Sequence, residues 1–296
     1  MITLSEHLKQ RFGEKTYRLS LSSGCSCPNR DGYIGYGGCT FCSEGGSGEF
    51  AAAPAPIDDQ INEAKKKISL KSDAGKFIAY FQSFTNTYGD VKRLKALYTE
   101  AIKRDDIVAL SLGTRPDCLD EDVMDMLRDL KKIKPVFIEL GLQTIHEETA
   151  RRIRRGYELS VFEDAYKRLK GEGFEVIVHV IFNLPGESRE DMLETVRYLS
   201  KLNPQLDGIK LQMLQILEGT DMAMEYKESP FPLMNMEEYT DLIVECIRVL
   251  PDDIVVHRMT GDGPRKTLIA PLWSLDKKRV LNTLNKKLTV SYNDKV

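Results

Sequence analysis

The chain has 296 residues, of which 42% are hydrophobic and 29% are charged, and its formal net charge is −3. This length suits one large α/β unit, and no unbroken apolar run is long enough to span a bilayer. The slightly acidic balance excludes an overall nucleic-acid signature, so RNA contacts would have to come from local basic patches. Such patches lie at residues 65–67, 151–155 and 277–287, although runs of this kind more commonly form solvated helix faces.

The N-terminal residues MITLSEHLKQRFGEK are polar and lack the apolar core of a secretory signal. We therefore expect a cytoplasmic protein with no membrane association. In a reducing compartment, the six cysteines would remain free rather than form disulfides.

Short apolar strands alternate with amphipathic helices from residue 17 to residue 214. This alternation predicts a parallel sheet covered by helices. Six strands are too few for a closed eight-stranded barrel, but they suit an open or partial one. The predicted strands are 17–22, 76–82, 107–112, 136–140, 175–182 and 208–214, and the predicted helices are 57–68, 91–103, 121–132, 146–154, 161–170 and 188–202.

Beyond residue 214 the regular alternation ends. A strongly amphipathic helix is predicted at 236–250 and a strand at 253–257, followed by the loop RMTGDGPRK and a basic helical tail. No flexible linker separates these elements from the rest. We therefore predict two parts: residues 1–214 form the barrel with its cysteine loop, and residues 215–296 form an α/β extension packed on it.

Polar and glycine-containing loops follow each predicted strand. They are the cysteine stretch, QSFTNTYGD, GTRPD, GLQT, NLPGE and QILEGT. Because the carboxyl ends of parallel strands meet at one edge of a sheet, we expect these loops to converge on one site.

Four cysteines, Cys25, Cys27, Cys39 and Cys42, lie close together among several glycines. Thiolates bind metals, and glycines allow the tight turns that bring sulfurs to one centre. Four thiolates suit a structural zinc ion. Three thiolates in the spacing C-x11-C-x2-C suit an iron–sulfur cluster with one open iron. A thioredoxin-like C-x2-C pair is a third reading, which leaves the glycines and the other cysteines without a role.

Six motifs in this order carry a resemblance to a known family. They are CPNRDG (27–32), GGCTFC (37–42), TRPD (114–117), ELGLQT (139–144), NLPGES (183–188) and HRMTGDGP (257–264). The chain resembles the radical S-adenosylmethionine (SAM) superfamily, in the branch of the radical-SAM domain of the Elongator catalytic subunit. Within that branch it is similar to the bacterial MnmL-type group.

The resemblance implies an α/β fold, a partial (βα)6 barrel. It implies a [4Fe–4S] cluster on Cys27, Cys39 and Cys42, with Cys25 taking no part. It also implies reductive cleavage of SAM to a 5′-deoxyadenosyl radical that abstracts hydrogen from a substrate. Zinc remains the alternative, in a non-enzymatic RNA-binding or scaffold protein.

The resemblance also suggests residues for SAM binding and catalysis. His179 and His257 are the catalytic candidates, against the simpler readings of a core histidine and a structural cap. Arg115, Asp117 and Glu139 have a simpler reading as a buried ion-pair group. The SAM-contact candidates are Phe41, Gln82, Ser83, Thr85, Asn86, Arg115, Asp117, Glu139, Gln143, Arg155 and Asn183.

The Elongator branch modifies the wobble uridine of tRNA. The resemblance to the MnmL-type group implies conversion of a carboxymethylaminomethyl side chain to aminomethyl. The expected partners are therefore tRNA and an electron donor such as flavodoxin or ferredoxin. The alternative substrate of the same chemistry is a small metabolite or a peptide.

Overall fold

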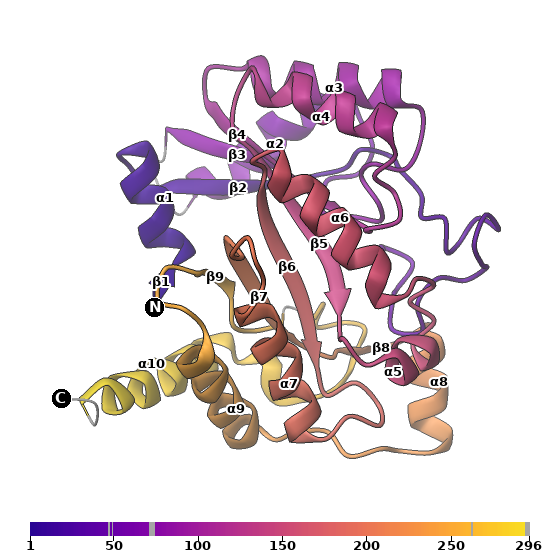
Figure 1. The fold of residues 1–296 in the computed structure, drawn as a ribbon, viewed down its shortest axis with the longest axis vertical. Coiled ribbons are helices and arrows are strands. Elements are labelled where there is room, and N and C mark those ends of the chain that lie inside the picture. Colours follow the sequence, from indigo (N-terminus) through magenta and orange to yellow (C-terminus); the bar gives the residue numbers. More distant parts are fainter. Residues whose placement is uncertain (47, 49, 71–74, 262, 294–296) are drawn as a thin grey trace.

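The computed structural model describes residues 1–46, 48, 50–70, 75–261 and 263–293. Within these residues the centre of the molecule is a curled sheet of eight strands, in the order β1-β9-β7-β6-β5-β4-β3-β2 (Figure 1). All neighbouring strands in it pair in parallel. The strands are β1 (Ile2–Thr3), β2 (Thr16–Leu21), β3 (Lys76–Phe81), β4 (Ile107–Thr114), β5 (Val136–Gln143), β6 (Glu175–Phe182), β7 (Gly208–Met213) and β9 (Val255–Arg258).

The six strands predicted up to residue 214 are confirmed as β2 to β7. They lie side by side in sequence order, as successive strand–helix–strand units require. The sheet is wider than the six strands predicted for the barrel, because β9 pairs with β7 and β1 pairs with β9. The boundary after residue 214 stays a prediction, since β9 from the second part completes the sheet of the first.

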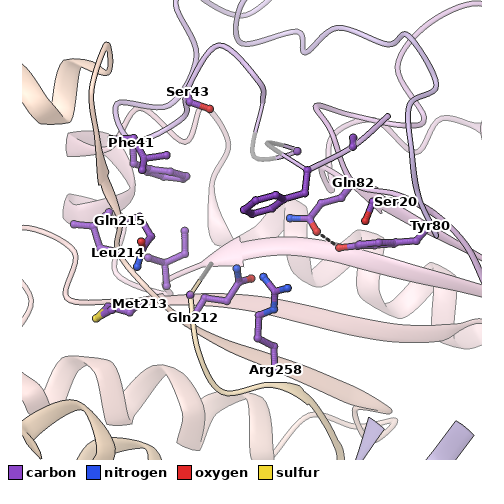
Figure 2. Close-up of a pocket in the computed structure, with 16 residues that line it drawn as sticks. Ser20, Phe41, Ser43, Tyr80, Gln82, Gln212, Met213, Leu214, Gln215 and Arg258 are labelled. Carbon is purple, nitrogen blue, oxygen red and sulfur yellow. Dashed lines mark hydrogen bonds between the residues drawn. The ribbon is translucent and has the colours of Figure 1, made fainter. Parts of the chain in front are cut away.

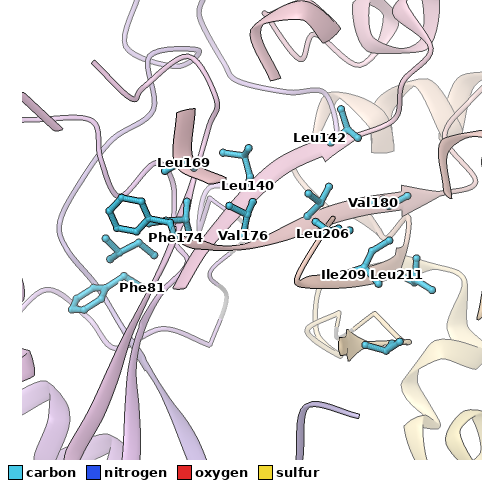
Figure 3. Packing of buried hydrophobic residues seen from close by; sticks show 14 of the residues in the cluster. Phe81, Leu140, Leu142, Leu169, Phe174, Val176, Val180, Leu206, Ile209 and Leu211 are labelled. Carbon is cyan, nitrogen blue, oxygen red and sulfur yellow. The ribbon is translucent and has the colours of Figure 1, made fainter. Parts of the chain in front are cut away.

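Helices cover the outer face of the sheet and enclose the main hydrophobic core. Figure 3 shows part of this core, where Leu169 and Phe174 pack near Leu140 and Val176. Burial of each such side chain stabilises the fold by roughly 1.5–3 kcal/mol. The helices between β2 and β7 are α2 (Ile57–Ser69), α3 (Val91–Lys103), α4 (Glu121–Lys131), α5 (Glu147–Arg152), α6 (Leu159–Gly171) and α7 (Arg189–Ser200).

Helix α1 (Leu4–Phe12) closes the inner face of the sheet near the amino ends of its strands. Its one buried residue, Leu8, packs against Ile78, Phe137 and Ile177. The sequence did not predict this helix, because a single buried leucine in nine residues gives little periodicity. With this end closed, space for ligands is left at the carboxyl ends of the strands.

The C-terminal part adds elements near both ends of the sheet. The strands β8 (Ile216–Leu217) and β10 (Leu268–Ala270) form a short antiparallel pair. The predicted helix at 236–250 is observed as α9 (Met236–Val249), and the basic tail forms α10 (Lys277–Asn293), which packs on α9. Helix α8 (Asp221–Glu228) lies near α5 and β8 beside the carboxyl ends of β5 and β6 (Figure 1).

None of the helices in the described part of the chain has the length and apolar character needed to cross a membrane. Asp262, which belongs to the HRMTGDGP motif, lies outside the described residues, as do the last three residues of the predicted extension.

Candidate functional site

The loop between β2 and α2 carries four cysteines and is held by hydrogen bonds at several points. The Asn29 side chain donates to the Arg154 carbonyl at 2.6 Å. The Arg30 guanidinium donates to the Cys42 carbonyl at 2.7 Å and packs across Gly38, where a Cβ would lie 2.8 Å from its Nε. Gly38 also has φ +84°, a conformation that favours glycine. The loop therefore holds a definite path around its cysteines.

Three of the four cysteines, Cys27, Cys39 and Cys42, line one cavity, which we call the cysteine chamber. Cys25 lies elsewhere: it is buried, its sulfur accepts from the Arg93 guanidinium at 3.7 Å, and it lines a different cavity. Burial, with a smaller contribution from the nearby Cys42, raises the pKa of Cys39 to about 12. This thiol is therefore neutral at pH 7 unless a metal replaces its proton.

The walls of the cysteine chamber come from the loop and from the carboxyl ends of β3 to β6. Four of the six predicted loops therefore meet at this cavity, whereas NLPGE and QILEGT do not line it. Besides the three cysteines, the predicted site residues in this wall are Phe41, Gln82, Thr85, Arg115, Glu139, Gln143, Arg155 and His179.

Two arginines in this wall are fixed by contacts within the chain. Asp117 holds Arg115 through two hydrogen bonds of 2.9 and 2.7 Å, and Arg115 donates to the Arg155 carbonyl at 2.8 Å. Asp117 therefore orients Arg115 and is not part of the chamber wall. Arg155 donates to the carbonyls of Leu142 and Thr144 at 3.1 and 2.6 Å, whereas its buried Nη2 has no hydrogen-bond acceptor among the described residues.

Tyr157 contacts both of these arginines. Its ring lies under both guanidinium groups, 4.9 Å from Arg115 and 4.5 Å from Arg155, a distance range typical of cation–π contacts. Its hydroxyl donates to the Gly141 carbonyl at 2.5 Å. The sequence suggested no role for this tyrosine, and only the fold shows that it lines the chamber.

Glu139 is fully buried at the centre of an ionic cluster on the inner face of the sheet. It contacts Arg18 at 3.1 Å and His179 at 2.8 Å, and it pairs directly with Lys210. The Tyr80 hydroxyl lies 3.1 Å from the same carboxylate. The simpler reading of Glu139, as part of a buried ion-pair group, therefore describes these contacts, although its partners are not Arg115 and Asp117.

The cluster shifts several pKa values. Burial opposes the charge of Glu139, but Lys210 and Arg18 outweigh it and hold the pKa of this carboxyl well below its usual range. Burial, aided by the Lys210 charge, lowers the pKa of His179 to about 4. His179 is thus neutral at pH 7, and its contact with Glu139 is a hydrogen bond. Burial lowers the pKa of Lys210 to about 7, against the attraction of Glu139.

Besides Asp117, four more predicted site residues lie outside the cysteine chamber. Asn86 is buried and donates to the Phe81 and Gly113 carbonyls, so it ties two strand ends together. Asn183 bonds the chain at Pro232 and Met234. His257 lines a cavity with His7 at the amino ends of the strands. The remaining one, Ser83, lies 3.5 Å from the Gly48 carbonyl.

Arg18, Tyr80 and Lys210 belong to the ionic cluster but were not among the predicted site residues. A signal was present in the sequence, because Arg18 and Lys210 are the charged residues of two segments that read as strands. Their common partner becomes visible only when the strands are placed side by side.

Comparison with known families identifies the chain. The model of the radical SAM superfamily matches residues 26–199, more than half of the sequence, and the radical SAM C-terminal domain matches residues 206–289. The chain belongs to the radical SAM superfamily. It is a radical SAM enzyme, and enzymes of this family use a [4Fe–4S] cluster and SAM.

Individual relatives agree with this assignment. The chain is 40% identical to the protein YtqA of Bacillus subtilis (strain 168), over 97% of this chain and 88% of the relative. It is 26% identical to Elongator complex protein 3 of Schizosaccharomyces pombe, over 53% of this chain and 28% of that protein.

A solved structure gives the same picture of the fold. The Elp3 structure from the archaeon Methanocaldococcus infernus superposes with a TM-score of 0.70 at 16% identity, covering 92% of this chain and 63% of that one. This likeness shows a fold shared with an Elp3-like radical SAM protein. The eight-stranded parallel sheet is the partial barrel of this fold.

The residues present fit the cofactors of a radical SAM enzyme. Three thiols face one cavity, and the fourth cysteine of the loop is turned away from it. Three ligands to a four-iron cluster leave one iron open for another ligand. The same cavity has arginine and glutamine side chains in its wall, suited to the carboxylate and polar groups of SAM. The assignment of Cys27, Cys39 and Cys42 as ligands, and of single residues to SAM, stays a prediction.

Proposed function

We propose that this radical SAM enzyme modifies the wobble uridine of tRNA, converting a carboxymethylaminomethyl side chain into aminomethyl. The observation that carries the proposal is a second cavity next to the cysteine chamber. The two share Phe41 and Gln82 as lining residues. Three glutamines, Gln82, Gln212 and Gln215, line this second cavity, which we call the glutamine chamber (Figure 2).

A chamber of this kind suits a nucleobase. Carboxamides donate and accept hydrogen bonds, as the polar edge of uracil requires. Phe41, Met213 and Leu214 supply apolar surface for the ring in the same cavity. The similarity to Elongator complex protein 3 supports the choice of an RNA substrate over a small metabolite or a peptide.

An exposed aromatic side chain supports binding of an unpaired RNA segment. Phe50 lines the glutamine chamber and is 63% exposed. Exposed rings of this kind stack on bases in single-stranded RNA. The arginines of residues 151–155 lie on the segment that contacts the cysteine loop at Asn29. Because Arg155 is buried, phosphate contacts would come from Arg151, Arg152 and Arg154, the last two of which pair with Glu225 and Asp221.

When bound, the cluster and SAM supply a 5′-deoxyadenosyl radical, with SAM as the overall two-electron oxidant that ends as methionine and 5′-deoxyadenosine. The methylene next to the substrate carboxylate would lose one hydrogen atom to this radical, then one proton to solvent, with one electron returned to the cluster. Hydrolysis of the resulting imine gives the aminomethyl group and glyoxylate. The role of the chain is to hold this methylene at the wall shared by the two chambers and to exclude water from it.

The proposed reaction also needs an electron donor, such as a flavodoxin or a ferredoxin. The cysteine loop, with its exposed Tyr33 and Tyr36, is the surface nearest the proposed ligands along the chain. A donor that approaches this loop would have the shortest path to the cluster.

The decisive experiment is mass spectrometry of tRNA hydrolysates from cells with and without the gene. We expect aminomethyluridine to disappear in the deletion strain and carboxymethylaminomethyluridine to accumulate. The enzyme, purified anaerobically, should then convert tRNA from that strain and release 5′-deoxyadenosine in proportion to the tRNA converted. An unchanged modification profile would rule out tRNA as the substrate.

A further inference from the structure

Two short basic segments of the C-terminal part lie beside the glutamine chamber. The first, Arg265 and Lys266, belongs to the loop that follows Gly261, a lining residue of this chamber. The loop leads into β10, where Leu268 lies beside Leu217, another lining residue. Both ends of the loop that carries these two cations therefore meet the chamber wall.

The second segment, Lys278 and Arg279, is in the first turn of α10. Shortly before this turn, the Ser274 hydroxyl accepts a hydrogen bond at 3.3 Å from the amide of Gln215, which lines the chamber (Figure 2). The Asp276 carboxylate accepts from the Arg279 backbone N–H at 3.1 Å and fixes the start of the helix. The second segment is thus tied to the same wall as the first.

The four side chains of these two segments, which we call the basic flank, are exposed. None of them forms an ion pair or a side-chain hydrogen bond in the part of the chain that the structure describes. Glu218, whose backbone N–H donates to the Thr267 carbonyl of the loop, pairs with Lys227 instead. By contrast, two of the three lysines at 65–67 and two of the four arginines at 151–155 pair with carboxylates.

We propose that the basic flank binds phosphates of the RNA whose base enters the glutamine chamber. This inference rests on the proposed function and adds the place where the substrate backbone lies. A nucleotide whose base enters a cavity leaves its phosphates outside, where lysine and arginine side chains of the adjoining surface can neutralise them. Such cations would also attract an acidic electron-donor protein. The position favours RNA, because the flank adjoins the glutamine chamber and none of its four residues is among the described residues that line the cysteine chamber.

The salt dependence of RNA binding tests the proposal. The probe is an anticodon stem-loop RNA with uridine at the wobble position, and fluorescence anisotropy with the cluster-loaded full chain measures its affinity between about 50 and 200 mM salt. One double variant combines Arg265→Gln with Lys266→Gln, and the other combines Lys278→Gln with Arg279→Gln. In each, the plot of log affinity against log salt concentration should become shallower by about 1.5–2, and affinity at about 0.1 M salt should fall about 10- to 100-fold.

The matched control combines Lys66→Gln with Lys67→Gln. It also removes two exposed positive charges, but from α2, which contributes no described residue to the lining of either chamber. This control should bind the RNA with the affinity and the salt dependence of the wild type. Because all the substituted side chains are exposed, each variant should fold, and circular dichroism establishes that it does.

Several results would overturn the proposal. Wild-type affinity and salt dependence in both double variants would exclude phosphate binding by the flank. An equal loss in the α2 control would show that binding follows net charge alone. Intact RNA binding with slower reduction of the cluster by flavodoxin would assign the flank to the electron donor. If the double variants lose RNA affinity as expected but deletion of the gene leaves the tRNA modification profile unchanged, the RNA surface stands and the proposed reaction fails.

Discussion

The two chambers differ in how firmly their polar side chains are held. In the cysteine chamber Arg115 is fixed by Asp117, and Arg155 by backbone carbonyls. In the glutamine chamber the Gln212 side chain has no hydrogen bond to another residue in the described part of the chain. A preformed wall suits a cofactor that is the same in every turnover, because its side chains do not have to be ordered each time the cofactor binds. The unbonded Gln212 amide can adapt to a substrate, whereas Gln82 and Gln215 bond Tyr80 and Ser274.

The largest effect should come from substituting the cysteines of the loop, because three of them line the cysteine chamber and Cys25 does not. Changing Cys27, Cys39 or Cys42 to serine removes one of the proposed cluster ligands, so iron and sulfide content and 5′-deoxyadenosine formation should be lost. Cys25→Ser is the matched control, because its sulfur lies in a different cavity beside Arg93. Loss of the cluster in Cys25→Ser, or a colourless wild type containing zinc, would contradict the three-ligand assignment.

The next largest effect concerns the ionic cluster beneath both chambers. Glu139→Gln leaves the buried Arg18 cation without its carboxylate, and Lys210, which loses the attraction that supports its charge, becomes a buried amine without this partner. Breaking a buried pair in this way costs about 3–5 kcal/mol, so the urea midpoint should fall strongly. Glu121→Gln is the control: this carboxylate is 67% exposed and its pairs with Arg128 should contribute less than about 1 kcal/mol.

A second variant tests whether the loss at Glu139 arises from polar groups left without their partner. Lys210→Met added to Glu139→Gln removes one of these groups, the buried Lys210 amine. The double variant should therefore be less destabilised than the sum of the single changes. Strict additivity would mean that Glu139 and Lys210 act independently.

The pH dependence of stability should report on the same cluster. The pKa of His179 is about 4 in the folded chain, against 6.5 for the ordinary group. Between these values the unfolded chain binds more protons, so stability falls as the pH falls from about 6.5 toward 4. The slope from one such group is at most about 1.4 kcal/mol per pH unit.

His179→Asn removes this contribution and should give a shallower profile in urea unfolding between about pH 5 and 7. His257, whose pKa burial also lowers, contributes to the slope in both proteins, so the difference between the profiles is the test. Parallel profiles would show that His179 does not titrate differently in the two states.

Much of the fold could be predicted because its signal is local. The strands β3 to β7 are largely apolar runs with residues buried on both faces, and turn residues bound them. By contrast, β1 has two residues and pairs with β9, which is more than 250 positions away in the chain. No pattern within so short a segment indicates such a partner.

The site was predictable to the extent that it depends on motifs. Three cysteines in the loop and several strand-end residues do line one chamber, because they follow strands that end at the same edge. The ionic cluster depends instead on register: Tyr80 lies beside Ser111, and His179 beside Lys210. Sequence shows that Lys210 is charged, but not that a buried carboxylate from β5 meets it.

The smallest effect tests the preformed wall of the cysteine chamber. Tyr157→Phe keeps the ring under Arg115 and Arg155 but removes the hydroxyl that donates to the Gly141 carbonyl. Loss of one such hydrogen bond should cost about 1 kcal/mol of stability, measured by urea unfolding. Tyr157→Ala also removes the ring, and the two cation–π contacts add roughly 0.5–2 kcal/mol each. If the corner is a rigid wall for SAM, the alanine variant should raise the KM for SAM in 5′-deoxyadenosine formation, and the phenylalanine variant should not. Equal KM values in both variants would show that the ring does not position these arginines for the cofactor.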